Sequence, residues 1–124
     1  MTIDIANGWR FEIDEGPEWL FLRLCRSGGD DVPEPPVAVR GWEIAEERRK
    51  RRLVFELGDD VLLTSFLVGQ LILLHKRAEM TGGAFRICGF SAHVYETLKM
   101  IRVADRFPNY ANREDAVLGR LPSR

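Results

Sequence analysis

One stretch of the sequence decides the fold: RLVFELGDDVLLTSFLVGQLILLHKRAEMTGG, residues 52–83. Its first six residues, 52–57, are mostly apolar and predict a buried strand, which ends at the turn residues 58–60. A helix is predicted from Ser65 to about Thr81, because the glycine pair 82–83 is a typical helix stop signal. The first three turns of this helix are apolar nearly all round, which predicts that it is buried against a sheet.

The N-terminal half predicts a hairpin, a loop and a helix. Residues 9–14 alternate apolar and polar side chains as a half-buried strand does, a turn follows at 15–18, and residues 19–25 predict the second strand. The stretch 27–36 is rich in glycine, aspartate and proline, and therefore predicts a loop. A short helix is predicted from Trp42 to Arg51.

The C-terminal part continues the alternation of strands and helices. Residues 84–88 predict a strand, Ser91 caps a helix that runs to about Lys99, residues 107–110 predict an extended piece, and Asn112 caps a terminal helix. The connections are long enough for parallel strand pairing. We therefore expect a single α/β domain over residues 1–124, with a mixed, mostly parallel sheet of four to five strands and about four helices packed on it.

Composition excludes several classes of protein. Of the 124 residues, 45% are hydrophobic and 30% are charged, which excludes wholesale disorder. The formal net charge is −1, so no overall field attracts nucleic acid or an anionic membrane. The N-terminus lacks the features of a signal peptide, and the apolar stretch 61–74 is too short and too interrupted to span a membrane. Cys25 and Cys88 lie in apolar runs, as reduced core thiols do, and we expect a cytoplasmic protein.

Motifs for enzymatic chemistry are missing from the sequence, which has no Gly-rich phosphate loop, G-x-S-x-G, C-x-x-C or H-E-x-x-H. His75 and His93 fall on different predicted helices without metal-ligand spacing, so neither a metal nor a cofactor is expected. Cys88 near His93 is more typical of a core cysteine than of a nucleophile. The basic run 48–52 is interpreted as a solvated helix end rather than a phosphate-binding patch, because acidic residues precede it. We therefore expect that the protein is not an enzyme.

The junction at residues 59–66, between strand and helix, carries the informative chemistry. Thr64 and Ser65 lie where the helix begins, and either hydroxyl can serve as the N-cap by accepting a hydrogen bond from an early helical N–H. A hydroxyl at this place is also suited to phosphorylation, because free N–H groups and the helix dipole hold a phosphate. A phosphate adds about −1.5 to −2 charges, which disrupts a docked apolar or acidic partner surface. The two interpretations are compatible.

Residues around this junction keep a fixed spacing: Glu56, Leu57, Val61, Leu62, Leu63, Thr64, Ser65, Gly69 and Leu71. The spacing resembles the STAS domain (sulfate transporter and anti-sigma factor antagonist), whose pattern is roughly D-L-s-g-V-x-f-h-D-S-S-G-L-G-x-L. Glu56 falls on the first aspartate, Thr64 on the second, and Ser65 on the serine that partner kinases phosphorylate. The resemblance covers about Leu53 to Leu118 and includes residues 75–78, 82–83, 85–87, 91–94, Leu98, Val103, Phe107 and 114–116.

The resemblance implies the STAS fold and the function of a bacterial anti-sigma factor antagonist, a non-enzymatic regulator of transcription. It implies that the unphosphorylated protein binds an anti-sigma factor or a serine kinase, and that phosphorylation of Ser65, or less favourably of Thr64, releases this partner. The residues that it implies for partner binding are Asp59, Asp60, Leu63, Thr64, Ser65, Phe66 and Gly69.

Three residues depart from the STAS pattern: Thr64 replaces the aspartate before the acceptor serine, Phe66 the next serine and Leu67 the glycine. The lost aspartate removes a carboxylate that could orient or activate the hydroxyl, and the two apolar residues make the helix start bulkier. Two alternatives therefore stay open. One is a degenerate STAS scaffold or homo-oligomer subunit without phosphorylation, motivated by an apolar helix start that we expect to be exposed, residues 61–63 with Phe66. The other is a small-ligand or nucleotide binder at the helix N-terminus.

Overall fold

A six-stranded sheet runs through the computed structural model, which describes residues 1–29 and 31–121. Asp30, in the predicted loop 27–36, lies outside the described residues. The strands are β1 (Thr2–Ala6), β2 (Trp9–Glu15), β3 (Trp19–Arg26), β4 (Arg52–Leu57), β5 (Ala84–Cys88) and β6 (Asn109–Tyr110). Strands β1 to β3 pair antiparallel, and β3 to β6 pair parallel. The mixed α/β sheet is confirmed.

The sheet has more strands than the four to five that the sequence predicts, because β1 pairs with β2 at the edge. This strand is short, it contains Asp4, a residue type depleted in strands, and its register shifts between Asp4 and Ala6. Only pairing with β2 makes such a segment a strand, so its own sequence is a weak signal.

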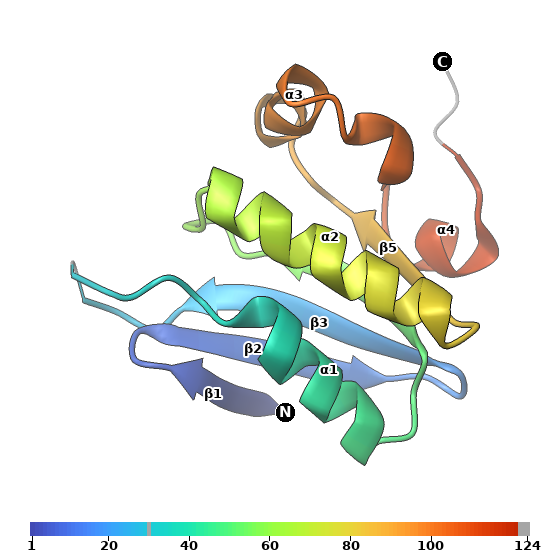
Figure 1. The fold of residues 1–124 in the computed structure, drawn as a ribbon, viewed down its shortest axis with the longest axis horizontal. Helices are drawn as coiled ribbons and strands as arrows, with labels where there is room; N and C mark the ends of the chain where they lie inside the picture. The colour runs from blue at the N-terminus through green and yellow to red at the C-terminus, as the bar shows by residue number, and fades with distance from the viewer. Residues whose placement is uncertain (30, 122–124) are drawn as a thin grey trace.

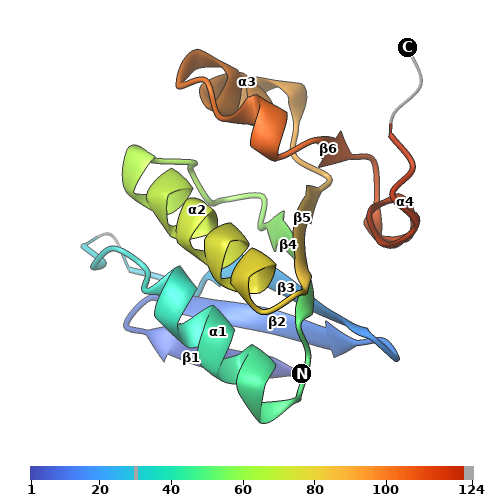
Figure 2. The ribbon, with the colours of Figure 1, turned by 45° about the vertical axis from the view of Figure 1, so that its right-hand side comes forward.

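Helices pack on both faces of the sheet, and one face is covered by more of them than the other. The helices are α1 (Val37–Glu47), α2 (Ser65–Met80), α3 (Ala92–Met100) and α4 (Arg113–Leu118), with a 3₁₀ turn η1 at Ala104–Arg106. Figures 1 and 2 show α1 and α2 side by side along one face of the sheet. Leu98 of α3 belongs to the same core cluster as these two helices, whereas Ala116 of α4 packs in a second cluster on the opposite face.

Alternation along the strands creates these two clusters. Leu20, Leu22 and Leu24 of β3, with Leu53 and Phe55 of β4, are fully buried beneath α1 and α2. The intervening residues point to the other face, where Trp19, Val54, Cys88, Tyr110 and Ala116 form the smaller cluster. Cys25 and Cys88 are both free and buried, as predicted, and burial raises the pKa of the Cys88 thiol to about 12.

Helix α1 begins five residues before the predicted start at Trp42, so that prediction is wrong. Pro36 occupies the N-cap position, and a proline at a helix start costs no hydrogen bond. The side chain of Gln70 reaches across from α2, and its Oε1 accepts a hydrogen bond from the Ala38 N–H at 3.0 Å. This contact spans 32 residues of sequence and is therefore invisible to local pattern analysis.

The basic run 48–52 lies outside α1, against the prediction that it ends a helix. Arg48 is the C-cap residue, and Arg49 has a left-handed backbone with φ of 56°, which stops the helix. Arg48 Nε lies 3.4 Å from the Glu15 carboxylate, and Arg52 lies 3.8 Å from that of Glu18. Part of the run is thus paired with acidic residues of the hairpin.

Helix α2 is buried along one stripe rather than all round, which corrects the prediction from its apolar composition. Leu67, Val68, Leu71, Leu74 and Ala78 are buried. By contrast, Phe66 is 41% exposed, Leu73 is 52% exposed and Met80 is 81% exposed. These three residues follow one another at seven-residue spacing, so they form one exposed apolar stripe on the helix. We call this set the outer stripe of α2.

The buried stripe of α2 predicts a sharp difference between neighbouring leucines. Leu71→Ala removes a fully buried side chain and leaves a cavity, so we expect a loss of about 3 kcal/mol in the free energy of unfolding. Leu73→Ala, the control two residues away, should change it by less than about 0.5 kcal/mol. Urea denaturation at low protein concentration measures both, and equal losses would contradict the burial pattern.

Candidate functional site

The start of α2 is held by Thr64. Its Oγ1 accepts a hydrogen bond from the Leu67 N–H at 3.1 Å, and its carbonyl oxygen accepts one from the Val68 N–H at 3.0 Å. Of the two hydroxyls that the sequence offers as caps, Thr64 is therefore the one that caps the helix. The N–H groups of Ser65 and Phe66 have no intrahelical acceptor, because they belong to the first turn.

Ser65 is the first residue of α2 and is exposed. Among the described residues, its hydroxyl has no hydrogen-bond partner, in contrast to the hydroxyl of Thr64. Two exposed apolar side chains lie near it in sequence: Leu62 is 81% exposed, and Phe66 is 41% exposed. The exposed apolar start expected from the sequence is thus correct for these two residues and wrong for Val61, which is only 4% exposed. We call Leu62, Thr64, Ser65 and Phe66 the α2-start surface.

The turn before this surface is tied to strand β3. Gly58 donates its N–H to the Leu24 carbonyl oxygen at 2.7 Å, and a Cβ at this glycine would lie 2.9 Å from the same oxygen. The close approach therefore favours glycine. Asp59 is fully exposed, its carboxylate 3.6 Å from the Arg23 guanidinium, and Asp60 is exposed beside it.

The remaining residues predicted for partner binding are spread along the helix. Leu63 is partly buried against the core, and Gly69 is partly buried one turn after Phe66. A Cβ at Gly69 would meet no atom within 4 Å, so local packing does not require a glycine at this position. The structure brings the serine, the cap and the two exposed apolar residues together, while Leu63 contributes mainly to packing.

A hollow of about 230 Å³ adjoins the α2-start surface, and sequence reasoning missed it. Its lining comes from three separate segments: Trp9, Arg26, residues 32–35, Leu62, Thr64 and Leu67. Arg26 lies over the Trp9 ring at 5.4 Å, and the Trp9 indole N–H donates to the Pro33 carbonyl oxygen at 2.7 Å. These contacts join residues up to 24 positions apart, so no local sequence motif predicts the hollow.

Glu56, which matches the first aspartate of the STAS pattern, lies on the opposite face of the sheet from α2. Arg113 of α4 donates from Nε to Glu56 Oε1 at 2.7 Å and from a terminal nitrogen to Asp14 Oδ2 at 2.6 Å. The Glu56 side chain is only 17% exposed. The hydrogen bond and charge of Arg113 hold the pKa of Asp14 below its usual value. Glu56 is therefore a structural ion-pair partner and not a part of the α2-start surface.

Two features of the described residues bear on metal binding and membrane insertion. In residues 1–29 and 31–121, no three His, Cys, Asp or Glu side chains gather in a way that could hold a metal ion. Within the same part of the chain, none of the helices combines the length and the apolar character needed to cross a bilayer.

Comparison with known proteins identifies the fold. No family model matches the sequence, and no curated protein sequence matches it. Among solved structures, an anti-sigma-factor antagonist (STAS) domain protein from Planctomyces limnophilus superimposes with a TM-score of 0.59 at 15% sequence identity. The match covers 88% of this chain and 96% of that chain. The order and arrangement of strands and helices are thus those of a STAS domain.

The Arg113 bridge predicts a pH-dependent loss of stability. Arg113→Ala leaves the largely buried Glu56 carboxylate without its partner, so we expect a loss of about 1–3 kcal/mol in the free energy of unfolding at pH 7. Because Arg113 lowers the pKa of Asp14, the stabilisation from Asp14 is present above its unfolded value near 3.8 and is lost as the pH falls through the folded value. The difference between wild type and variant should therefore shrink in acid.

Arg120→Ala is the control, because Arg120 pairs with the exposed Glu114 and with Asp115 near the end of α4. It should cost less than about 0.5 kcal/mol. Urea denaturation at several pH values measures both variants, and an unchanged stability of Arg113→Ala would show that the bridge contributes nothing.

Proposed function

We propose that this chain, whose fold is that of an anti-sigma-factor antagonist (STAS) domain, is a non-enzymatic regulatory module that binds a protein partner through the α2-start surface. The observation that carries the proposal is the state of Ser65. Its hydroxyl is exposed and unpartnered among the described residues at the first position of a 16-residue helix, while the neighbouring Thr64 does the capping.

Phosphorylation of Ser65 is the proposed switch. A kinase transfers the γ-phosphoryl group of ATP to Ser65 Oγ, ADP leaves, and the hydroxyl proton passes to a base of the kinase. The free N–H groups of Ser65 and Phe66 and the dipole of α2 stabilise the new phosphate. The phosphate adds about −1.5 to −2 charges beside the exposed side chains of Leu62 and Phe66, which opposes docking of an apolar partner surface.

Thr64 is a poorer acceptor for the same group. Its Oγ1 already accepts a hydrogen bond from the Leu67 N–H, so phosphorylation there disturbs the cap that begins α2. A threonine in place of the STAS aspartate keeps the capping role, because both residue types are good N-caps. It does not supply a carboxylate, so the kinase itself must activate the Ser65 hydroxyl.

The proposed partner is an anti-sigma factor or a serine kinase in the cytoplasm of a bacterium, and this rests on the STAS resemblance. The size of the hollow beside Thr64 also favours a protein over a small ligand. At about 230 Å³ it is smaller than typical small-molecule sites, which take roughly 300–1,000 Å³. Exposed Leu62 and Phe66 are instead the kind of side chains that a partner protein covers.

The phosphoryl-transfer step is tested by intact mass. We expect wild-type protein, incubated with serine switch kinases of the source organism and Mg-ATP, to gain the mass of one phosphoryl group. Ser65→Ala should gain none, while Thr64→Ser, which keeps the cap, should still be modified. A wild-type mass that stays unchanged while an authentic antagonist is modified by the same kinases would exclude the switch and favour the scaffold alternative.

Partner binding is tested by a charge at the same position. Ser65→Asp should weaken binding to the anti-sigma factor of the source organism at least about tenfold, because a carboxylate replaces a hydroxyl on the docking surface. Ser91→Asp is the matched control: Ser91 is an exposed serine at the start of α3, and aspartate preserves its cap. Isothermal titration calorimetry measures both.

The pattern of affinities separates the two forms of the proposal. If Ser65→Asp binds as tightly as wild type while Phe66→Ala binds more weakly, the surface is a docking site without a phosphate switch. If neither change affects an interaction that wild type shows, the α2-start surface is not the binding site.

A further inference from the structure

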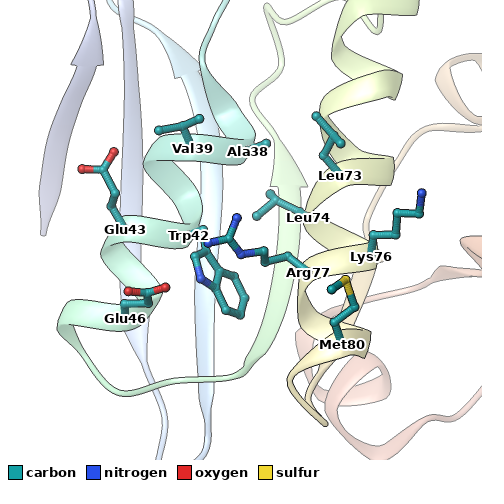
Figure 3. Close-up of a pocket in the computed structure, with 10 residues that line it drawn as sticks. All are labelled: Ala38, Val39, Trp42, Glu43, Glu46, Leu73, Leu74, Lys76, Arg77 and Met80. Carbon is teal, nitrogen blue, oxygen red and sulfur yellow. The ribbon is translucent and has the colours of Figure 1, made fainter.

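An apolar groove lies between α1 and α2 on the helix-covered face. It has a volume of about 430 Å³, and its lining residues are Ala38, Val39, Trp42, Glu43, Glu46, Leu73, Leu74, Lys76, Arg77 and Met80 (Figure 3). Three of the apolar side chains are freely accessible, because Val39 is 65% exposed, Leu73 is 52% exposed and Met80 is 81% exposed. Such a concentration of exposed apolar side chains is typical of an interaction surface.

The lining residues of the two rims carry opposite charges, and Glu43 also lies 3.3 Å from Arg40 of its own helix. Glu43 and Glu46 lie on the α1 rim, while Lys76 and Arg77 lie on the α2 rim (Figure 3). The Arg77 guanidinium also lies over the Trp42 ring at 5.5 Å, so it bridges the groove. The lining is therefore acidic on the α1 side and basic on the α2 side, with apolar side chains and the Arg77 guanidinium between them.

The two helices run in the same direction. Each connects neighbouring parallel strands, α1 from β3 to β4 and α2 from β4 to β5, and both return over the same face of the sheet. Figure 3 shows the acidic side chains of α1 and the basic side chains of α2 along the same stretch of the groove. The hydrogen bond from the Ala38 N–H to Gln70 Oε1 holds the helices in this relation.

We propose that the α1–α2 groove binds a second copy of this chain. A two-fold axis along the groove places α1 of one copy opposite α2 of the other, so Glu43 and Glu46 of each copy meet Lys76 and Arg77 of its partner. The apolar residues Val39, Leu73 and Met80 then pack between the two charged rows. A closed dimer needs such a self-complementary surface, in which the same patch serves both partners.

Charge balance favours a second copy over another protein. A partner of uniform charge is attracted by one rim and repelled by the other, whereas a second copy satisfies both rims at once. Val39, Leu73 and Met80 provide the apolar centre, and the charged rows provide the rim that most interfaces have. The groove occupies the C-terminal half of α2, so this interface is separate from the α2-start surface and does not depend on the function proposed for it.

The test uses two variants that each make the surface uniformly charged. Glu43→Lys with Glu46→Lys makes both rims basic, and Lys76→Glu with Arg77→Glu makes both rims acidic. We expect wild type to dimerise with a dissociation constant of about 10–100 μM, which more salt weakens, and each variant alone to remain monomeric. An equimolar mixture of the two variants should restore a dimer, because the opposite charges again meet. Sedimentation velocity measures all four samples.

Glu96→Lys with Asp105→Lys is the matched control, because it makes the same change in net charge at exposed positions outside the groove. It should dimerise as wild type does. The single variants Glu43→Lys and Lys76→Glu leave the Arg77 contact with Trp42 intact and should give a smaller loss that is also restored by mixing. Wild type that stays monomeric up to about 1 mM, or variants that do not associate when mixed, would overturn the proposal.

Discussion

The packing of α2 against the sheet is the interaction on which the rest of the molecule depends. Its stripe of Leu67, Leu71, Leu74 and Ala78 is buried against strands whose inward residues are themselves fully buried. This contact fixes the rotation of the helix, and so decides which of its side chains reach solvent. Ser65 at one end and the outer stripe at Phe66, Leu73 and Met80 are both consequences of that one orientation. Both proposed surfaces therefore share one structural support.

On the opposite face of the sheet, α4 covers only part of the surface, so the strand residues outside it remain in contact with water. Charged side chains occupy much of the uncovered area and form ion pairs. Arg23 of β3 pairs with Glu12 of β2, and Arg113 of α4 pairs with Asp14 of β2. Arg23 also lies 3.6 Å from Asp59, in the turn that leads to α2. The polar face thus remains compatible with water, and its pairs contribute to the position of that turn.

Local signals explain which elements the sequence predicts well. The bounds of β4, α2, β5 and the capped start of α3 follow from apolar runs, glycine stops and cap residues, which act over a few positions. The start of α1 and the strand β1 escaped prediction, because Gln70 and the pairing with β2 stabilise them from a distance. For the site, Thr64 and Ser65 were found from their place before an apolar helix, but which of them is the cap could not be told from their adjacent positions alone.

By itself, the sequence determined the order of strands and helices from β2 onward, the two core cysteines and the hydroxyl pair at the start of α2, because these depend on short-range patterns. Only the tertiary structure decided which faces of the helices stay exposed, since burial depends on what packs against them. In the folded chain Thr64 is the cap of α2, Glu56 forms an ion pair with Arg113, and α1 and α2 lie on the two sides of a groove. The ion pair and the groove join residues that are far apart in sequence, and the cap depends on which hydroxyl accepts the Leu67 N–H. Both kinds of contact form only when the chain is folded.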